Sequence, residues 1–326
     1  MMKLESHVLR GSIPPLVTPF KGGKVDYETY ARLVEFQIEG GSHGILVNGT
    51  TSEPSTLSVE ERNRLVDVAV EAAAGRVPIV AATGSQSFAE TEALTRHAGK
   101  AKADALLIVT PYYIRPPQRG LVQYYVEMGK ITKLPWMIYH IPGRAAISVT
   151  LDTVREIAKL SPTFVGMKHA VDDLGFVSKC LDALGMDFRI FVGLEDLSFP
   201  MMAIGACGLM NAVGNLMPGK LALLASEILH GHMEHARQLH YELFEINQAV
   251  FYDTNPIPMK YMMKRLGILP RNEHRLPMVP ALPELEKRLD GVLERAGLLG
   301  AGKKQRAAAM KVQRPRARQS SARTAK

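Results

Sequence analysis

Eight short apolar segments alternate with helical segments over roughly the first two thirds of the chain, which predicts an α/β fold, a (β/α)8 TIM barrel with a C-terminal helical extension. The apolar segments are continuous runs, as expected of parallel strands buried on both faces. An open doubly wound sheet is the alternative. The sequence disfavours it, because no strand is followed by G-x-G-x-x-G and G-x-x-x-x-G-K-[ST] is absent.

The predicted strands are short and rich in Ile, Val, Leu and Ala. They cover residues 12–20, 44–48, 78–83, 105–110, 136–139, 164–168, 189–192 and 208–213. Within the first, Pro14, Pro15 and Pro19 restrict the chain to extended geometry.

Capping residues mark several helix starts. Asp26 precedes the first helix, Ser58 and Glu61 form a capping-box pattern before the second, and Ser87 precedes the third. Later helices are predicted from about Gln118, from about Leu151, and over 173–184 and 195–204.

The chain divides into three predicted parts: residues 1–218 form the barrel with the active site, 219–298 a helical region, and 299–326 a basic tail. The helices of the second part are expected at 219–231, 233–250, 257–266 and 283–298. Nine of the 40 Lys and Arg residues lie between Lys303 and Lys326, which contains no acid, so residues 1–302 hold 31 basic and 32 acidic residues. The net charge of +8 thus belongs to the tail, which is predicted to be disordered, and we expect no nucleic-acid partner.

Composition indicates a globular protein of the cytoplasm. With 326 residues, 46% of them hydrophobic, the chain can bury a full core. Cys180 and Cys207 are too few for a disulfide framework, which favours a reduced compartment. A leader pattern and an apolar run of membrane-spanning length are both missing, so neither secretion nor a membrane partner is expected.

Lys168 ends the apolar run Phe164–Met167, which reads as a buried strand. One interpretation is an exposed lysine just past a strand. The other is an amine that burial keeps partly neutral, ready to form a Schiff base with a carbonyl substrate.

Polar residues at the predicted strand ends favour the second interpretation. Catalytic groups of (β/α)8 barrels project from the carboxyl ends of the strands. The candidates at these ends are Thr50, Thr51, Tyr112, Tyr113, Tyr139, Arg144 and Lys168. Together they suit carbonyl chemistry on a small carboxylate: the lysine forms an imine, a phenol relays protons, and hydroxyls or the guanidinium hold carboxylates.

Each residue also has a purely structural explanation. Tyr112 could be an amphipathic core residue, Thr50 and Thr51 could form only a turn, and Arg144 could pair with a loop acid. His232 and His235 lie one helical turn apart, but a third ligand in register is missing, so a metal site is not predicted.

Several motifs resemble the dihydrodipicolinate synthase / N-acetylneuraminate lyase family, in order over roughly residues 10–298. They are Leu16-Val17-Thr18-Pro19-Phe20, Gly49-Thr50-Thr51-x-Glu53, Thr110-Pro111-Tyr112-Tyr113, Tyr139-x-Ile141-Pro142-Gly143-Arg144, Gly166-Met167-Lys168 and Asn255-Pro256-Ile257-Pro258-Met259-Lys260. The resemblance implies a pyruvate-dependent lyase or aldolase of the Schiff-base type, without a cofactor, on a (β/α)8 barrel.

The resemblance also implies roles for single residues. Lys168 matches the lysine that forms the imine with pyruvate, and Tyr139 the phenol that moves protons at that imine. Thr50 and Tyr113 match the rest of a proton relay. In the family this tyrosine usually reaches across a dimer interface, and the usual assembly is a homotetramer built from dimers, so a homotetramer or homodimer is expected.

Three further residues match substrate-binding positions. Thr51 matches the residue that holds the pyruvate carboxylate, and the main chain near Met210 lines the pyruvate pocket. Arg144 matches the arginine that receives the carboxylate of aspartate semialdehyde in the synthase branch. The neuraminate lyases typically lack that arginine, so pyruvate and aspartate semialdehyde are the expected substrates.

Some residues depart from the family pattern. Ser52 stands where glycine is usual, His140 where asparagine is common, and His169 where glutamate is common. Because they flank the predicted site, they keep open an alternative, another pyruvate-dependent aldolase or hydratase acting on a sugar acid or a catabolic intermediate. The loops that bind lysine in feedback-inhibited members also differ, although Glu90 is retained, so inhibition by lysine is not expected.

Overall fold

A computed structural model describes residues 2, 4–5 and 7–299 and shows eight parallel strands in one sheet. The strands are β1 (Gly11–Ser12), β4 (Ile45–Val47), β5 (Ile79–Ala82), β6 (Ala105–Val109), β7 (Trp136–His140), β8 (Phe164–His169), β9 (Arg189–Val192) and β10 (Gly208–Leu209). They pair in the order β1-β10-β9-β8-β7-β6-β5-β4. A parallel bridge between Pro15 and Leu46 joins the two ends, so the sheet closes into the predicted barrel.

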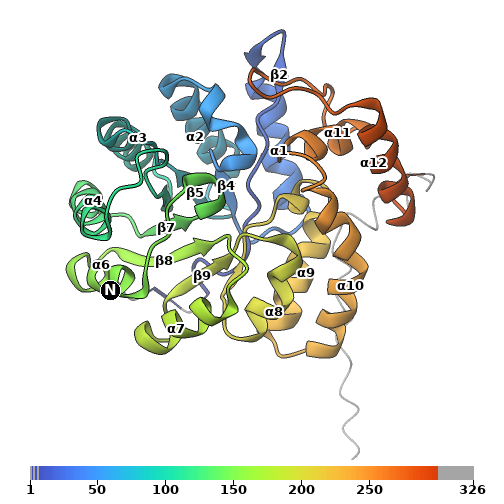
Figure 1. The fold of residues 1–326 in the computed structure, drawn as a ribbon. Helices are drawn as coiled ribbons and strands as arrows, with labels where there is room; N and C mark the ends of the chain where they lie inside the picture. The colour runs from blue at the N-terminus through green and yellow to red at the C-terminus, as the bar shows by residue number, and fades with distance from the viewer. Residues whose placement is uncertain (1, 3, 6, 300–326) are drawn as a thin grey trace, which may run out of the picture.

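Helices surround the strands, as Figure 1 shows. They are α1 (Tyr27–Glu39), α2 (Val59–Ala73), α3 (Phe88–Lys100), α4 (Gln118–Ile131), α5 (Pro142–Ala145), α6 (Leu151–Leu160), α7 (Leu174–Leu184), α8 (Ser198–Ala203) and α9 (Pro218–Leu229). The predicted caps are confirmed: Asp26 accepts from Thr29 N–H, and Ser58 and Glu61 bond reciprocally. Each cap satisfies amide groups that a helix start would leave unpaired.

The barrel has two apolar layers. Leu46, Leu107, Met137 and Phe191 fill its interior, whereas the larger cluster lies between the strands and the helices. Because successive residues of a strand face opposite sides, the interior and exterior sets alternate along β7. This alternation decides which side chains at the strand ends can enter a central site.

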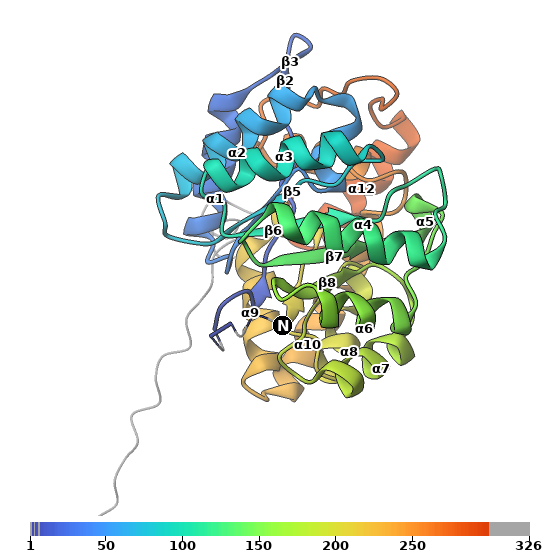
Figure 2. The same ribbon diagram turned by 90° about the vertical axis from the view of Figure 1, so that its left-hand side faces the viewer.

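Two predicted strands are shorter in the structure. To the barrel, the segment 12–20 contributes only Ser12 of β1 and the bridge at Pro15, because Pro14 and Pro15 have no N–H to donate to a ladder. The segment 208–213 contributes β10 and then becomes the 3-10 turn η4 (Ala212–Asn215). The structure also contains a small antiparallel hairpin that the sequence did not predict, β2 (Phe20–Lys21) with β3 (Lys24–Val25), which projects at one end of the molecule (Figure 2).

The remaining described helices are α10 (Met233–Ala249), α11 (Ile257–Arg265) and α12 (Pro283–Arg295). The hairpin tip is held by this region, since Gly22 N–H donates to the carboxylate of Glu273 at 3.1 Å. No helix among the described residues is both long and apolar enough to cross a bilayer. Of the predicted basic tail, residues 300–326 lie outside the described part of the chain.

Candidate active site

A cavity of about 650 Å³ opens beyond the carboxyl ends of β4 to β7. Its wall includes Thr50 after β4, Tyr139 on β7, Arg144 on α5 and Asn255 just before α11. The barrel geometry places it there, because the carboxyl ends of all eight parallel strands meet at one rim. Residues that are far apart in the sequence therefore share one pocket wall.

Lys168 and Tyr139 are neighbours in register on β8 and β7. The Lys168 Nζ lies 4.6 Å from the centroid of the Tyr139 ring, and both side chains are buried. Among the described residues, no carboxylate lies within ion-pair distance of Lys168. An amine that is buried without a salt-bridge partner is suited to nucleophilic attack on a carbonyl.

The hydroxyl groups of Thr50 and Tyr139 lie 3.2 Å apart, within hydrogen-bond distance. Thr50 starts the turn η1 (Thr50–Ser52) after β4, so the contact joins the ends of two strands that β5 and β6 separate in the sheet. Either oxygen can donate, which is the property required of two successive members of a proton relay.

Asn255 brings Thr51 and Arg144 together. Its Nδ2 donates to Thr51 Oγ1 at 3.0 Å, and its main-chain carbonyl accepts from the Arg144 guanidinium at 3.4 Å. Asn255 belongs to one of the sequence motifs, but the sequence alone predicts no role for it. Its position in the C-terminal region gives no signal of a contact with residues about two hundred positions earlier.

A buried ion pair supports the threonine turn from behind. Lys260 on α11 donates to Glu53 Oε1 at 2.8 Å, and both side chains are fully buried. Glu53 has a left-handed backbone (φ 57°) directly after η1, and His274 contacts its other oxygen at 3.4 Å. Burial lowers the pKa of Lys260, an effect that the charge of Glu53 opposes. The pair anchors the C-terminal region against the turn that carries Thr50 and Thr51.

Tyr113 lies apart from the other predicted residues. Its side chain is 85% exposed, whereas its neighbour Tyr112 lines the cavity. Lys168, Thr51 and Met210 are also not part of the cavity lining, but their side chains are buried. Its backbone has φ 75°, so the loop after β6 turns this side chain outward. In one chain, the predicted relay therefore contains only Thr50 and Tyr139.

Gly193 and Met210 follow the last two strands of the barrel, β9 and β10. Met210 follows β10, is buried, and its N–H donates to Val192 O at 2.9 Å. Gly193 follows β9, and a Cβ there would lie 2.9 Å from Lys168 Cε and 2.8 Å from Ala170 Cβ. Only glycine lets the chain pass this close to the lysine side chain.

The three residues that depart from the family pattern face away from the cavity. Ser52 donates to Leu16 O at 2.6 Å, inside the protein. His140 and His169 face each other at 3.2 Å between their Nδ1 atoms, and both rings pack against Phe176 of α7. Burial lowers the pKa of His140 to about 3 and that of His169 to about 4. The expectation that these residues influence the second substrate by flanking the site is not supported by their positions.

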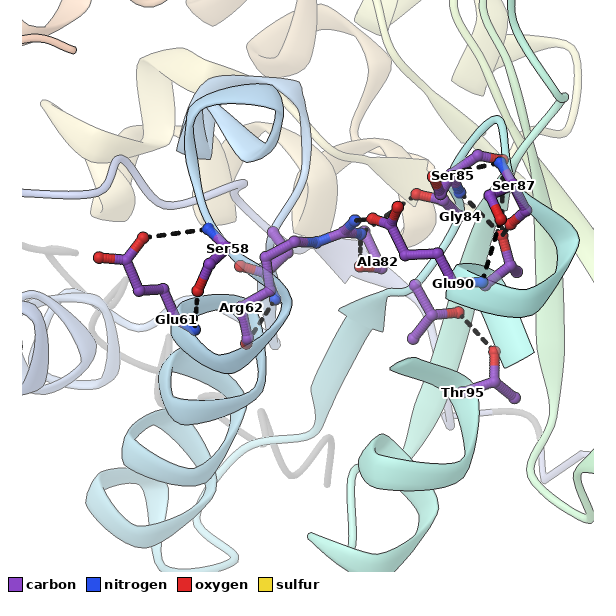
Figure 3. Close-up of polar contacts among 12 residues, drawn as sticks. Ser58, Glu61, Arg62, Ala82, Gly84, Ser85, Ser87, Glu90 and Thr95 are labelled. Carbon is purple, nitrogen blue, oxygen red and sulfur yellow. Dashed lines mark hydrogen bonds and ion pairs between the residues drawn. The ribbon is translucent and has the colours of Figure 1, made fainter. Parts of the chain in front are cut away.

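Arg62 of α2 forms part of the cavity wall on the side of the loops after β4 and β5 (Figure 3). Its guanidinium donates to Glu90 Oε1 at 3.1 Å and to the carbonyls of Ala82 and Gly84. Its side chain is only 5% exposed, and its Nη1 and Nη2 atoms both donate to the protein itself, whereas its buried Nε has no partner among the described residues.

Comparison with known proteins agrees with the fold. The model of the dihydrodipicolinate synthetase family matches residues 8–296. A 4-hydroxy-tetrahydrodipicolinate synthase from Thermus thermophilus is 44% identical over 293 residues, which cover 90% of this chain and 98% of the relative. The crystal structure of the dihydrodipicolinate synthase from Aquifex aeolicus superposes with a TM-score of 0.87 at 38% identity, covering 89% of this chain and 98% of that one. A structure described as a monomeric dihydrodipicolinate synthase variant superposes with a TM-score of 0.87 at 35% identity, covering 90% of this chain and 99% of that one. The chain belongs to the dihydrodipicolinate synthetase family.

Proposed function

We propose that this enzyme condenses pyruvate with aspartate semialdehyde, the activity of a 4-hydroxy-tetrahydrodipicolinate synthase. The observation that carries the proposal is the buried Lys168 lying against the Tyr139 ring, whose hydroxyl meets Thr50 in a cavity that also contains Arg144. One amine, two hydroxyls and one guanidinium are the groups that imine chemistry on two small carboxylates requires.

The first step joins pyruvate to the enzyme. The Lys168 Nζ attacks the C2 carbonyl carbon, a C–N bond forms, the C–O bond breaks, and the oxygen leaves as water. The Thr51 hydroxyl binds the pyruvate carboxylate: because Asn255 Nδ2 already donates to Thr51 Oγ1, the Thr51 O–H proton is free to point at an anion. The electron sink is the imine itself, so the proposal includes no metal or other cofactor.

The second step forms the carbon–carbon bond. Tyr139 removes a proton from the pyruvate methyl group, which gives an enamine on Lys168. The enamine carbon adds to the aldehyde carbon of the second substrate, whose carboxylate pairs with Arg144, and the new alkoxide takes a proton back from Tyr139. Thr50, at 3.2 Å from the Tyr139 hydroxyl, passes protons to and from that group.

We further propose that the working assembly is a homodimer or homotetramer. The proton path needs a further hydroxyl beyond Thr50, and the exposed Tyr113 is turned out of its own cavity. A tyrosine with this exposure can enter the cavity of a neighbouring subunit, so Tyr113 of the partner subunit would complete the relay. Sedimentation velocity measures the assembly of the chain and of Tyr113→Phe, and steady-state kinetics measures the activity of both. Tyr113→Phe should lose activity without losing assembly.

Borohydride trapping tests the chemistry directly. Incubation with pyruvate and borohydride should add a reduced pyruvate adduct to the peptide that contains Lys168, read by mass spectrometry. Lys168→Arg should abolish the label, whereas Lys264→Arg, at an exposed lysine on α11, should not change it. A label elsewhere, or none, would refute the mechanism.

A panel of aldehydes identifies the second substrate. Pyruvate with aspartate semialdehyde should give the highest turnover, because Arg144 supplies a cationic site for its carboxylate. Turnover near background with aspartate semialdehyde, but not with a sugar-acid aldehyde, would favour the aldolase alternative.

A further inference from the structure

Glu195 is a buried carboxylate at the same rim as Lys168. It opens the 3-10 turn η3 (Glu195–Leu197) after β9 and is 2% exposed. The chain that leads to it passes Gly193, whose Cβ position lies 2.9 Å from Lys168 Cε. The strand end therefore runs past the lysine and directly into this carboxylate.

The carboxylate holds the segment after β10. Its Oε1 accepts from the N–H of Ala212 at 2.6 Å, two residues beyond Met210. Asn247 of α10 donates its Nδ2 to the Glu195 carbonyl at 3.3 Å, which fixes the turn from the other side. Glu195 thus connects β9, α10 and the main chain around Met210 in one buried arrangement.

The second oxygen of this carboxylate is not engaged by the surrounding protein. Among the described residues, Glu195 Oε2 is buried without a hydrogen-bond partner, and no Lys, Arg or His nitrogen lies within ion-pair distance of the carboxylate. Burial raises the pKa of Glu195 to about 7, against the Ala212 hydrogen bond and the charge of Lys168. The charged groups that act on it are Lys168 from β8, which favours ionisation, and Asp196 from its own turn, which opposes it.

We infer that Glu195 is a positioning residue of the reaction: it fixes the Met210–Ala212 main chain beside pyruvate and supplies the negative charge that offsets the protonated imine on Lys168. The inference rests on the proposed function. When the Lys168 Nζ bonds to C2 of pyruvate and the oxygen leaves as water, the protonated imine nitrogen retains one positive charge. A carboxylate nearby in a water-poor interior stabilises that charge more strongly than it would in water.

The test compares the chain with Glu195→Gln, which keeps the shape and an amide oxygen for Ala212 N–H but removes the charge. The measurement is the pyruvate concentration that gives half-maximal borohydride trapping on Lys168, at about pH 6 and about pH 8. At the lower pH the two proteins should differ by less than about threefold, because Glu195 itself is largely protonated. At the higher pH the variant should need about tenfold more pyruvate, since only the parent carries the carboxylate.

Two further variants separate charge from packing. Glu195→Asp keeps the charge but shortens the reach to Ala212. The pyruvate concentration that it needs for half-maximal trapping, divided by that of the parent, should therefore not grow with pH. Glu227→Gln, at a buried acid on α9 that contacts His232, is the matched control and should equal the parent at both pH values.

The inference would be overturned if the half-maximal pyruvate concentration of Glu195→Gln, divided by that of the parent, were the same at both pH values, because a packing effect does not depend on ionisation. If Glu195→Gln does not fold, Glu195→Asp serves as the test. The inference is then overturned if the half-maximal pyruvate concentration of Glu195→Asp, relative to the parent, grows with pH. Absence of trapping in the unaltered chain refutes the proposed function instead.

Discussion

The side chain of Asn255 donates to the hydroxyl of Thr51 at 3.0 Å, although 204 positions separate the two residues. This contact brings the segment between α10 and α11, within the C-terminal helical region, into the cavity wall. It also sets the direction of the Thr51 hydroxyl proton, because an oxygen that accepts from an amide keeps its own proton for another acceptor. The C-terminal region is therefore part of the site as well as a support for the barrel.

Substitution of Asn255 should weaken pyruvate binding. Asn255→Ala removes the donor, and we expect the KM for pyruvate to rise about tenfold with a smaller change in kcat, as for loss of one hydrogen bond to a binding group. Asn255→Asp should raise the KM for pyruvate further, because its carboxylate accepts the Thr51 proton and repels an anionic substrate. Steady-state kinetics check both variants, and pyruvate binding of parental strength in Asn255→Asp would contradict the assigned geometry.

The contact between Thr50 and Tyr139 should matter for turnover rather than binding. Thr50→Val preserves the shape and removes the hydroxyl, so kcat should fall about 100-fold, the size of one proton-transfer contribution. Thr50→Ser keeps a hydroxyl and should recover most of the rate. If the Val and Ser variants have equal kcat, Thr50 does not relay protons.

Loss of one member of the buried Glu53–Lys260 pair should destabilise the fold. Lys260→Met leaves the Glu53 carboxylate buried beside His274, and we expect a loss of about 3–5 kcal/mol in the free energy of unfolding by urea. The double variant Lys260→Met with Glu53→Gln should regain part of this loss because no charge remains buried. A single variant within about 1 kcal/mol of the parent would show that the pair is dispensable.

The histidine pair should make the fold sensitive to acid. The folded-state pKa of His169 is lowered from 6.5 to about 4, so the unfolded chain binds more protons between these values. The free energy of unfolding should therefore fall as the pH drops from about 6.5 towards about 4, by up to about 3 kcal/mol for His169.

Urea unfolding at several pH values measures this slope. His169→Gln should flatten it, whereas His230→Gln, at an exposed histidine after α9, should leave it unchanged. A slope that His169→Gln does not alter would assign the acid sensitivity to other groups.

Lysine should not inhibit the enzyme. The Glu90 carboxylate already pairs with Arg62, whose buried guanidinium adds positive charge where an ammonium group would have to bind. Initial rates should be the same with and without millimolar L-lysine. Concentration-dependent inhibition would show that the Arg62–Glu90 pair opens to admit the ligand.

Much of the fold was predictable from local patterns. The alternation of buried strands with capped helices identified the barrel, because the periodicity and capping residues that indicate each element lie within a few residues of one another. The errors lie at β1 and β10, where the extent of a strand depends on backbone pairing with distant partners rather than on composition. The hairpin β2–β3 was missed because its two-residue strands are too short for a periodic signal.

The sequence by itself determined the barrel, the lysine at the end of β8 and the rim residues Thr50, Tyr139 and Arg144, since these follow from strand ends and motifs. Tertiary structure alone decided which way the side chains next to them face. It turned His140 and His169 towards α7, directed Tyr113 outward, and brought Asn255 and Glu195 to the site. The physical reason is that facing depends on the register of the closed sheet and on contacts between segments far apart in the chain, and a single sequence does not encode these locally.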